Sequence, residues 1–323
     1  MVDVFVSGLL FFDVVFTGLP HGPVPGTEVW TEDSATGPGG IANFAVTLAR
    51  LGLTTSLSAA FGDDQFGRLC WETLESVEGI DLSRSRRFTG WPTPVTVSLA
   101  YEDDRALVTH GRPAPLTADQ LIGTPPPSRA AIVHIGPEPT AWVPLAHAGG
   151  TKVFADVGWD PSQRWSSDVL DQLAHCHGFL PNAEEAMAYT RTSTPAAAVA
   201  RLADLVPLAV VTCGREGAIA IDGSTGEQAS APALAVDALD TTGAGDVFGA
   251  SLVAGTLAGW PLADRLRFAN LCAALSVRRL GGAPAAPGWS SIARWWLGTH
   301  DSQLRTDYAF LDQVLDHDRL ANS

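Results

Sequence analysis

The stretch Asp240-Thr-Thr-Gly-Ala-Gly-Asp246 decides the fold and the chemistry that the sequence predicts. Gly243, Ala244 and Gly245 are small, so the backbone can turn sharply there and present bare N–H groups. The apolar run 247–254 that follows predicts a buried helix, which would begin at about Gly245. The turn would then lie at a helix N-terminus, where free N–H groups and the helix dipole favour an anion.

Asp246 would lie in the first turn of that helix, beside the position of the anion. Because like charges repel, simple phosphate binding explains this carboxylate poorly. It fits a site where the carboxylate accepts the proton of a hydroxyl group that attacks a phosphoryl group, while the N–H groups stabilise the transferring charge. The residues alone leave an alternative, which is an ordinary helix start with an Asp that suits the dipole.

The pattern Asp-Thr-x-Gly-Ala-Gly-Asp resembles the C-terminal signature of the PfkB (ribokinase-like) carbohydrate kinases. The resemblance implies an α/β fold in which a mostly parallel central sheet carries helices on both faces and a small β lid. It implies that Asp246 is the catalytic base and that Gly243, Ala244 and Gly245 form the anion hole. We therefore expect residues 1–323 to form a single α/β kinase domain that transfers the γ-phosphate of ATP to a hydroxyl of a small carbohydrate.

Composition and charge narrow the class of protein. Hydrophobic residues make up 46% of the chain and charged residues 17%, which is enough apolar sequence for a large core. The net charge of −15 argues against a nucleic-acid partner and against an anionic membrane surface. The four cysteines lack the spacing of a metal site, and the N-terminus does not read as a signal peptide. We expect a cytoplasmic protein.

Short apolar runs alternate with helical patterns along much of the chain. Such alternation, with strands that are apolar on both faces, predicts a parallel sheet covered by helices on each side. The runs that predict strands include 2–7, 130–135, 152–157 and 208–212.

Two further segments predict a second, smaller group of strands. The alternation in Thr27-Glu-Val-Trp-Thr31 predicts an edge strand within the Gly- and Pro-rich residues 14–36. Residues 93–100 and 105–110 alternate around an acidic turn and predict a hairpin. The resemblance implies that about 14–36 and 91–112 form a lid over the sugar, and we expect a homodimer through this lid.

The sugar side of the predicted site lies in the first 43 residues. Asp13 follows the first strand, where a carboxylate can contact ligand or simply lie in a solvated turn. Asn43 lies near a helix start, where its side chain can cap the helix or bind a hydroxyl group. The resemblance implies that Asp13, Gly39, Gly40 and Asn43 bind substrate. Within the resemblance, Phe11 stands where ribose-specific members carry an Asn, which argues against ribose as the acceptor. The glycine-rich segment 37–43 lacks the Lys that members acting on phosphorylated sugars often carry, which favours a neutral sugar or a nucleoside over a phosphorylated sugar.

The nucleotide side lies in the second half of the chain. Asn182 and Glu185 have the spacing of a capping box, and the resemblance implies a further role in holding Mg²⁺ and phosphate. It also implies that Thr212, Gly214 and Gly217 border the nucleotide and that Asn270 lies near adenine. Asp240 and Thr242, with the loop 281–284, resemble a site for a monovalent cation such as K⁺.

The sequence leaves two other functions open and disfavours a third. A nucleoside kinase of the adenosine kinase type and a non-catalytic sugar-binding protein on the same scaffold stay open. A nicotinamide-dependent oxidoreductase needs G-x-G-x-x-G after the first strand, where this chain has Gly8-Leu-Leu-Phe-Phe12, so that function is disfavoured.

Overall fold

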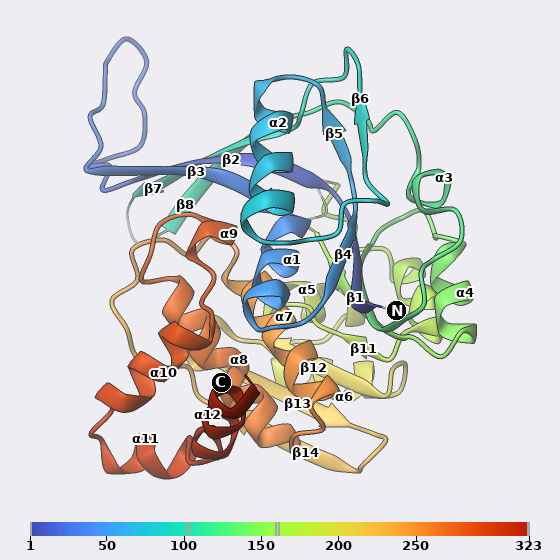
Figure 1. Ribbon diagram of the computed structural model, residues 1–323, viewed down its shortest axis with the longest axis vertical. Coiled ribbons are helices and arrows are strands. Elements are labelled where there is room, and N and C mark those ends of the chain that lie inside the picture. Colours follow the sequence, from blue (N-terminus) through green and yellow to red (C-terminus); the bar gives the residue numbers. More distant parts are fainter. Residues whose placement is uncertain (1, 102–103, 159, 161, 322–323) are drawn as a thin grey trace.

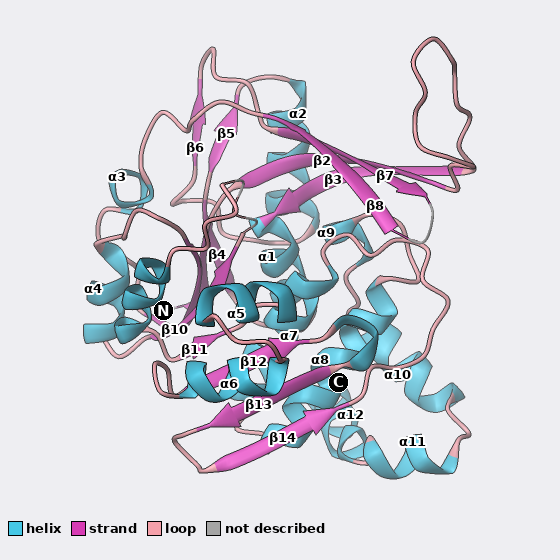
Figure 2. Cartoon of the chain, turned by 180° about the vertical axis from the view of Figure 1, so that it is seen from behind, coloured by secondary structure: helices cyan, strands magenta, loops and turns pink. Residues whose placement is uncertain are grey.

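The computed structural model describes residues 2–101, 104–158, 160 and 162–321. Its largest sheet has eight strands in the order β14-β13-β12-β11-β10-β9-β1-β4 (Figures 1 and 2). The six strands from β12 to β4 run parallel, and β13 and β14 pair antiparallel at one end. Their bounds are β1 (Val2–Ser7), β4 (Thr55–Ser58), β9 (Ser128–Ile135), β10 (Lys152–Val157), β11 (Gly178–Phe179), β12 (Leu208–Thr212), β13 (Ala218–Asp222) and β14 (Glu227–Ala231).

Helices cover both faces of this sheet, as the near-continuous apolar strands predict. In β1, Val4 and Val6 belong to one hydrophobic cluster and Phe5 to the other, so alternate residues face opposite layers. The first layer holds α1 (Ile41–Arg50), α7 (Ala244–Leu257) and α8 (Leu262–Ser276). The second holds α4 (Trp142–Ala148), the 3₁₀ helix η2 (Ser167–His175), α5 (Ala183–Thr190) and α6 (Pro195–Ala203).

A separate sheet of four strands, in the order β3-β2-β7-β8, lies across one end of the large sheet (Figures 1 and 2). Its strands are β2 (Leu10–Thr17), β3 (Asp33–Gly40), β7 (Val95–Tyr101) and β8 (Asp104–His110). The predicted hairpin is confirmed as β7 and β8. The strand expected at 27–31 is wrong, because those residues form no strand, and the Gly-rich segment 37–40 is itself the end of β3.

The remaining elements are small. A two-stranded sheet pairs β5 (Ala60–Gly62) with β6 (Arg86–Phe88). The helices and turns outside the two layers are α2 (Gln65–Glu72), the π-helix η1 (Thr73–Val77), α3 (Ala118–Ile122), the 3₁₀ turn η3 (Gly214–Glu216), α9 (Gly282–Ala285), α10 (Trp289–Gly298), α11 (Ser302–Asp307) and α12 (Phe310–Ala321).

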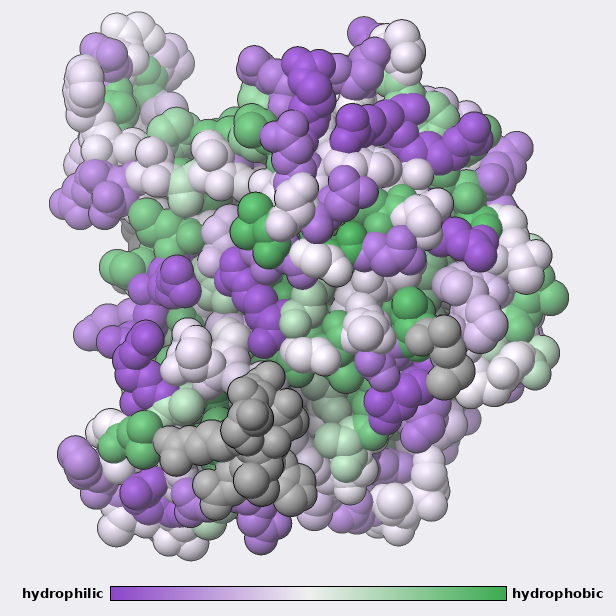
Figure 3. All heavy atoms as spheres, viewed as in Figure 1, coloured by the Kyte–Doolittle hydropathy of each residue, from purple (hydrophilic) through white to green (hydrophobic). Residues whose placement is uncertain are grey.

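The C-terminal segment packs onto the body of its own chain. Tyr308 and Leu311 are buried in the first hydrophobic cluster, and Leu315 packs against it. These residues follow the amphipathic pattern of the sequence between 299 and 323. By contrast, residues 18–32 between β2 and β3 stand away from the rest of the molecule and mix apolar with polar surface (Figures 1 and 3).

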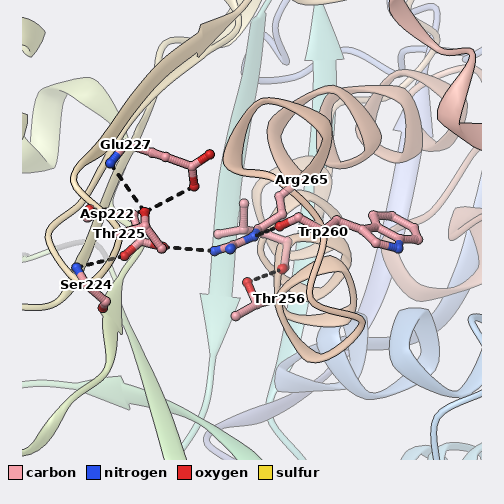
Figure 4. A network of polar contacts seen from close by, with 8 residues as sticks. Asp222, Ser224, Thr225, Glu227, Thr256, Trp260 and Arg265 are labelled. Atoms are coloured by element: carbon pink, nitrogen blue, oxygen red, sulfur yellow. Dashed lines mark hydrogen bonds and ion pairs between the residues drawn. The ribbon is translucent and has the colours of Figure 1, made fainter.

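A buried ion pair joins the first helical layer to the edge of the sheet (Figure 4). Arg265 on α8 donates from Nη1 to Oδ2 of Asp222 at 3.1 Å and from Nε to the carbonyl of Trp260 at 2.6 Å. Both partners are nearly inaccessible to solvent, with side-chain exposures of 10% and 4%. The pair therefore fixes how α8 lies on β13.

Among the described residues, no helix has both the length and the apolar sequence that a membrane-spanning segment requires.

Candidate active site

The candidate residues gather where the parallel strands of the large sheet end. His134 and Asp156 lie near the carboxyl ends of β9 and β10, and Asn182 and Thr212 lie at the same edge after β11 and at the end of β12. Ligands of open α/β sheets bind outside the carboxyl ends of the strands. The N-terminus of α7 lies at this edge, because the carboxylate of Asp246 in its first turn is within 4.8 Å of ligand atoms of His134 and Asp156.

Helix α7 begins as the sequence predicts. Its N-cap is Gly243, with φ 74°, and its first residue is Ala244. A Cβ at Gly243 would lie 2.9 Å from Nδ2 of Asn43, so that turn needs a glycine for space as well as for its dihedral angle. The amide of Ala244 donates to the carbonyl of Thr241 at 3.3 Å. The amides of Gly243 and Gly245 have no hydrogen-bond partner among the described residues, so they are available to an anion.

The carboxylate of Asp246 is held by α1. Asn43 donates from Nδ2 to Oδ2 of Asp246 at 2.7 Å, and Asn43 itself is buried. The expectation that Asn43 caps a helix is wrong, because α1 begins at Ile41 and its N-cap is Gly40. Asn43 lies on the side of α1 that faces α7. Its Oδ1 is buried and unpaired, so this side chain has one unused acceptor.

Asp13 lies within β2 and is 8% exposed, so the reading of a solvated turn carboxylate is wrong. The pairing of β2 with β3 places its carboxylate against Gly39, where a Cβ would fall within bonding distance of Oδ2. Gly40 has φ 59° and connects β3 to α1. Two glycines therefore allow β3 to pass directly over the Asp13 carboxylate.

Several carboxyl groups at this edge lie close enough to one another to interact electrostatically. Burial raises the pKa of Asp13 to about 7, and the charges of Asp246 and Asp240 add to that rise. Burial also raises the pKa of Asp246 to about 6, against the Asn43 hydrogen bond and the charge of Arg105, which lower it. The pKa of Glu185 is raised to about 6, mainly by burial and also by the charge of Asp246. Such mutual repulsion is relieved by a cation.

Sequence reasoning missed two residues of this group, His134 and Asp156. Their ligand atoms and those of Asp246 all lie within 4.8 Å of one another. Burial, then the charges of Glu185 and Asp246, holds the pKa of Asp156 well above its usual range. Burial lowers the pKa of His134 to about 4, so its ring is neutral. Their place at the end of two apolar strands was a signal that could have identified them.

Asn182 and Glu185 form the capping box that their spacing predicts. The Asn182 side chain accepts from the Glu185 amide at 3.0 Å, and the Glu185 carboxylate accepts from the Asn182 amide at 2.9 Å. The box presents Glu185 on the first turn of α5, toward the group formed by Asp156 and Asp246. Carboxylate and amide oxygens are ligands that suit Mg²⁺.

Thr212 ends β12, and the turn that follows contains Gly214 and Gly217, both with positive φ. A Cβ at Gly217 would lie 2.1 Å from the carbonyl oxygen of Ala231, so β14 packs directly over that glycine.

Asn270 is buried, and its Nδ2 donates to the carbonyls of Ala231 and Pro232 at 3.0 and 3.1 Å. Its amide hydrogens are therefore used to hold the segment after β14.

Asp240 closes the turn before α7. One carboxylate oxygen accepts from the amide of Thr242 at 2.9 Å, and the other from the amide of Gly281 at 2.8 Å. The four-stranded sheet contacts this same turn. Arg105 on β8 donates to Oγ1 of Thr241 at 2.6 Å, and the hydroxyl groups of Ser98 and Thr242 lie 3.4 Å apart. The smaller sheet thus touches the loop that carries the free amides.

Most of the chain resembles a family of known proteins. The family model described as pfkB family carbohydrate kinase matches residues 4–288. A curated fructokinase from Klebsiella pneumoniae is 33% identical over 284 residues, which cover 80% of this chain and 91% of that protein.

Solved structures agree in fold. The ribokinase of Arabidopsis thaliana, solved with ribose and ATP, has a TM-score of 0.75 at 23% identity and covers 93% of this chain and 99% of its own. A putative ribokinase II from E. coli, solved with ATP and Mg²⁺, also has a TM-score of 0.75, at 20% identity, over 91% of this chain and 100% of its own. At these identities the likeness shows a ribokinase-like fold. The family model and the fructokinase show more: this chain belongs to the pfkB family of carbohydrate kinases, phosphotransferases that act on a sugar hydroxyl.

Proposed function

We propose that this chain transfers the γ-phosphate of ATP to a hydroxyl group of a small sugar, with Asp246 as the base. The single observation that carries the proposal is the start of α7. There a carboxylate held by Asn43 lies one residue from the free amide of Gly245 and three from that of Gly243. Because ATP is an intracellular metabolite, we also propose that the protein works in the cytoplasm.

The proposed step is an in-line displacement at phosphorus. The acceptor oxygen forms a bond to the γ-phosphorus while the bond to the β–γ bridging oxygen breaks, and ADP leaves with that electron pair. Asp246 accepts the hydroxyl proton. The amides of Gly243 and Gly245 donate to the transferring phosphoryl oxygens, and Ala244 joins them if its 3.3 Å bond to Thr241 gives way.

The donor set at the sheet edge fits Mg²⁺. Asn182 and Glu185 offer an amide and a carboxylate oxygen. Burial is the main cause of the raised pKa values of Glu185 and Asp156, and neighbouring carboxylates add to it, so a cation there would stabilise the ionised groups. When bound, Mg²⁺ would neutralise charge on the phosphates of ATP. Thr212, Gly214 and Gly217 are proposed to border the nucleotide. Asn270 is proposed to act there by fixing the segment after β14.

The acceptor is proposed to bind between the two sheets. Asp13 supplies a buried carboxylate for sugar hydroxyl groups, and Gly39 and Gly40 let the backbone of β3 approach closely. Asn43 is proposed to serve the substrate through its hold on Asp246 and through its unpaired Oδ1. Fructose is the first acceptor to test, because the 33% identical relative is a fructokinase and Phe11 replaces the Asn of ribose-specific members.

We propose that residues 1–323 act as one kinase domain in which the four-stranded sheet is the lid. The contacts of Arg105 and Ser98 with Thr241 and Thr242 support this, since they join the lid to the catalytic loop. The lid is also proposed to form the homodimer interface, because Trp30, Leu107 and Val108 are 82%, 55% and 62% exposed.

A K⁺ ion beside Asp240 and Thr242 is a separate proposal. Each Asp240 oxygen accepts one backbone N–H, which leaves lone pairs for a cation. Turnover in KCl, compared with choline chloride at equal ionic strength, tests it. Equal rates in the two salts would remove K⁺ from the account.

The function is tested by ADP release over a panel of acceptors that includes fructose, ribose, other neutral sugars and adenosine, with mass spectrometry of the product. We expect one sugar to give one phosphorylated product for each ADP released. Turnover with adenosine alone would assign the chain to the nucleoside kinases. Clear binding of a sugar without turnover of any acceptor would favour a non-catalytic sugar-binding protein.

A further inference from the structure

A basic pocket lies on the outer side of α8, away from the residues of the candidate active site. Its volume is about 630 Å³, and its lining residues come from the C-terminal end of α8, the segment after it and helix α10. Three of its lining side chains are Arg278, Arg279 and Arg294. None of the described residues that line it is Asp or Glu. This is an unusual concentration of one charge in a chain whose net charge is −15.

The three guanidinium groups are available to a ligand. All three arginines are exposed, and among the residues that the structure describes their side chains have no hydrogen-bond or ion-pair partner. Other arginines on the same layer are paired, such as Arg265 with Asp222 and Arg267 with Asp264. Arginine side chains gathered without carboxylates repel one another, and a phosphate group is the anion that suits their planar donor geometry.

The rest of the lining favours an organic phosphate over a bare ion. Ser291 adds a hydroxyl group, and Trp295 adds an aromatic ring that is fixed by an edge-to-face contact with Tyr308 at 5.0 Å between centroids. A volume of this size accommodates a small metabolite. We propose that this pocket binds a small phosphorylated metabolite, at a site separate from the catalytic one.

The position of the pocket also gives it a route to the catalytic loop. Arg279 lies two residues before Gly281, whose amide donates to Asp240 at 2.8 Å. Asp240 holds the turn that leads into α7. A ligand that orders the segment 278–281 would therefore act on the loop that carries the free amides of Gly243 and Gly245.

The inference does not rest on the position of Arg278 and Arg279 just after α8. Cations near a helix C-terminus stabilise the helix through its dipole, and that role needs no ligand. If the arginines only stabilise α8, replacing them lowers the stability of the unliganded protein and leaves anion binding unchanged. A measurement of anion binding therefore distinguishes stabilisation of the helix from a ligand site.

The test is isothermal titration of the full chain with inorganic phosphate, glucose 6-phosphate and AMP, at low ionic strength. It compares the wild type with Arg278→Gln/Arg294→Gln and with Arg68→Gln, a control that removes an exposed arginine on α2. For at least one ligand, we expect the wild type and the control to show one more binding site than the double variant, or an affinity about tenfold higher.

Phosphate groups can also bind at the anion hole, so the comparison between variants decides the outcome. Equal stoichiometry and affinity in the wild type and the double variant, for all three ligands, would overturn the proposal. A difference for inorganic phosphate alone would reduce the site to one for the free ion and contradict the metabolite. Failure of the catalytic assay would leave these titrations unaffected, since they require no turnover.

Discussion

The hydrogen bond from Asn43 to Asp246 joins two helices at the carboxylate that the proposed reaction uses. Burial raises the pKa of Asp246, and this bond opposes the rise. The carboxylate must be ionised to accept a proton, so the balance between these two effects sets the lowest pH at which the enzyme works. Here the pKa of about 6 for Asp246 predicts that turnover falls as the pH drops through that value.

Replacing Asn43 by Ala should move that acid limb to higher pH. The substitution removes the donor that favours the ionised form, while the burial that disfavours it stays. The measurement is kcat/KM against pH for the wild type, for Asn43→Ala and for Thr47→Ser, a control one turn along α1 that keeps its hydroxyl group. An unchanged acid limb in Asn43→Ala would show that the bond does not tune the base.

Asp13 makes stability depend on pH in the opposite sense to most carboxylates. Its pKa in the folded chain is about 7, above its ordinary value near 4, so the folded state binds more protons than the unfolded state between those values. Stability should therefore rise as the pH falls from about 8 to about 5.5.

Asp13→Asn should reduce that dependence and raise the melting temperature at about pH 8, because the uncharged amide removes the cost of burying a charge and also the repulsion from Asp246 and Asp240. Scanning calorimetry at both pH values tests this, with Asp237→Asn on the surface as the control. If Asp13→Asn melts like the control at both values, Asp13 is not the buried acid described here.

At the scale of elements, the sequence correctly predicted the helices and strands whose local pattern is typical of only one structure. The strands at 2–7, 152–157 and 208–212, the capping box at Asn182 and the start of α7 are confirmed within one or two residues. These segments combine apolar runs with a cap or a glycine that fixes one end.

The errors fall where local patterns are ambiguous. Gly37-Pro-Gly-Gly40 reads as a loop, but it forms a strand because β2 supplies the pairing partner and Asp13 leaves no room for a Cβ at Gly39. Asn43 reads as a cap, yet a contact with Asp246, 203 residues away, uses its side chain. His134 and Asp156 belong to no local motif, and the register of β9 with β10 brings them together. Tertiary contacts of this kind leave no periodicity in the sequence.

The ion pair between α8 and β13 gives a prediction at this scale. Asp222→Ala leaves the Arg265 guanidinium buried without its partner, so it should cost about 3–5 kcal/mol of unfolding free energy. The double variant Asp222→Leu/Arg265→Met should recover much of that loss, because it removes both charges and keeps the volume. Urea unfolding measures both. A loss below about 1 kcal/mol in the single variant would place the pair among solvent-screened surface pairs.

On the scale of the whole molecule, we propose that the four-stranded sheet both covers the acceptor site and forms the dimer interface. It touches the turn before α7 through Arg105 and Ser98, and it exposes Leu107 and Val108 on its edge strand β8. An exposed apolar edge strand tends to associate unless another chain covers it. A second copy of the chain is the proposed cover.

Light scattering should then give the mass of two chains for the wild type and of one chain for Leu107→Glu/Val108→Glu. The control is Leu145→Glu/Leu205→Glu, which adds the same two charges at exposed leucines outside the lid. A dimer that persists in the lid variant would move the interface elsewhere, and a monomeric wild type would remove it.

The central claim is that Asp246 takes the proton of the acceptor while the amides beside it hold the phosphoryl group. The most direct measurement compares Asp246→Asn with the wild type for turnover and for the affinity of the sugar and of ATP, in the same buffer. We predict that turnover falls by at least about 100-fold, since a general base contributes that much, while both affinities stay within a few-fold. Turnover near the wild-type rate in Asp246→Asn would contradict the account.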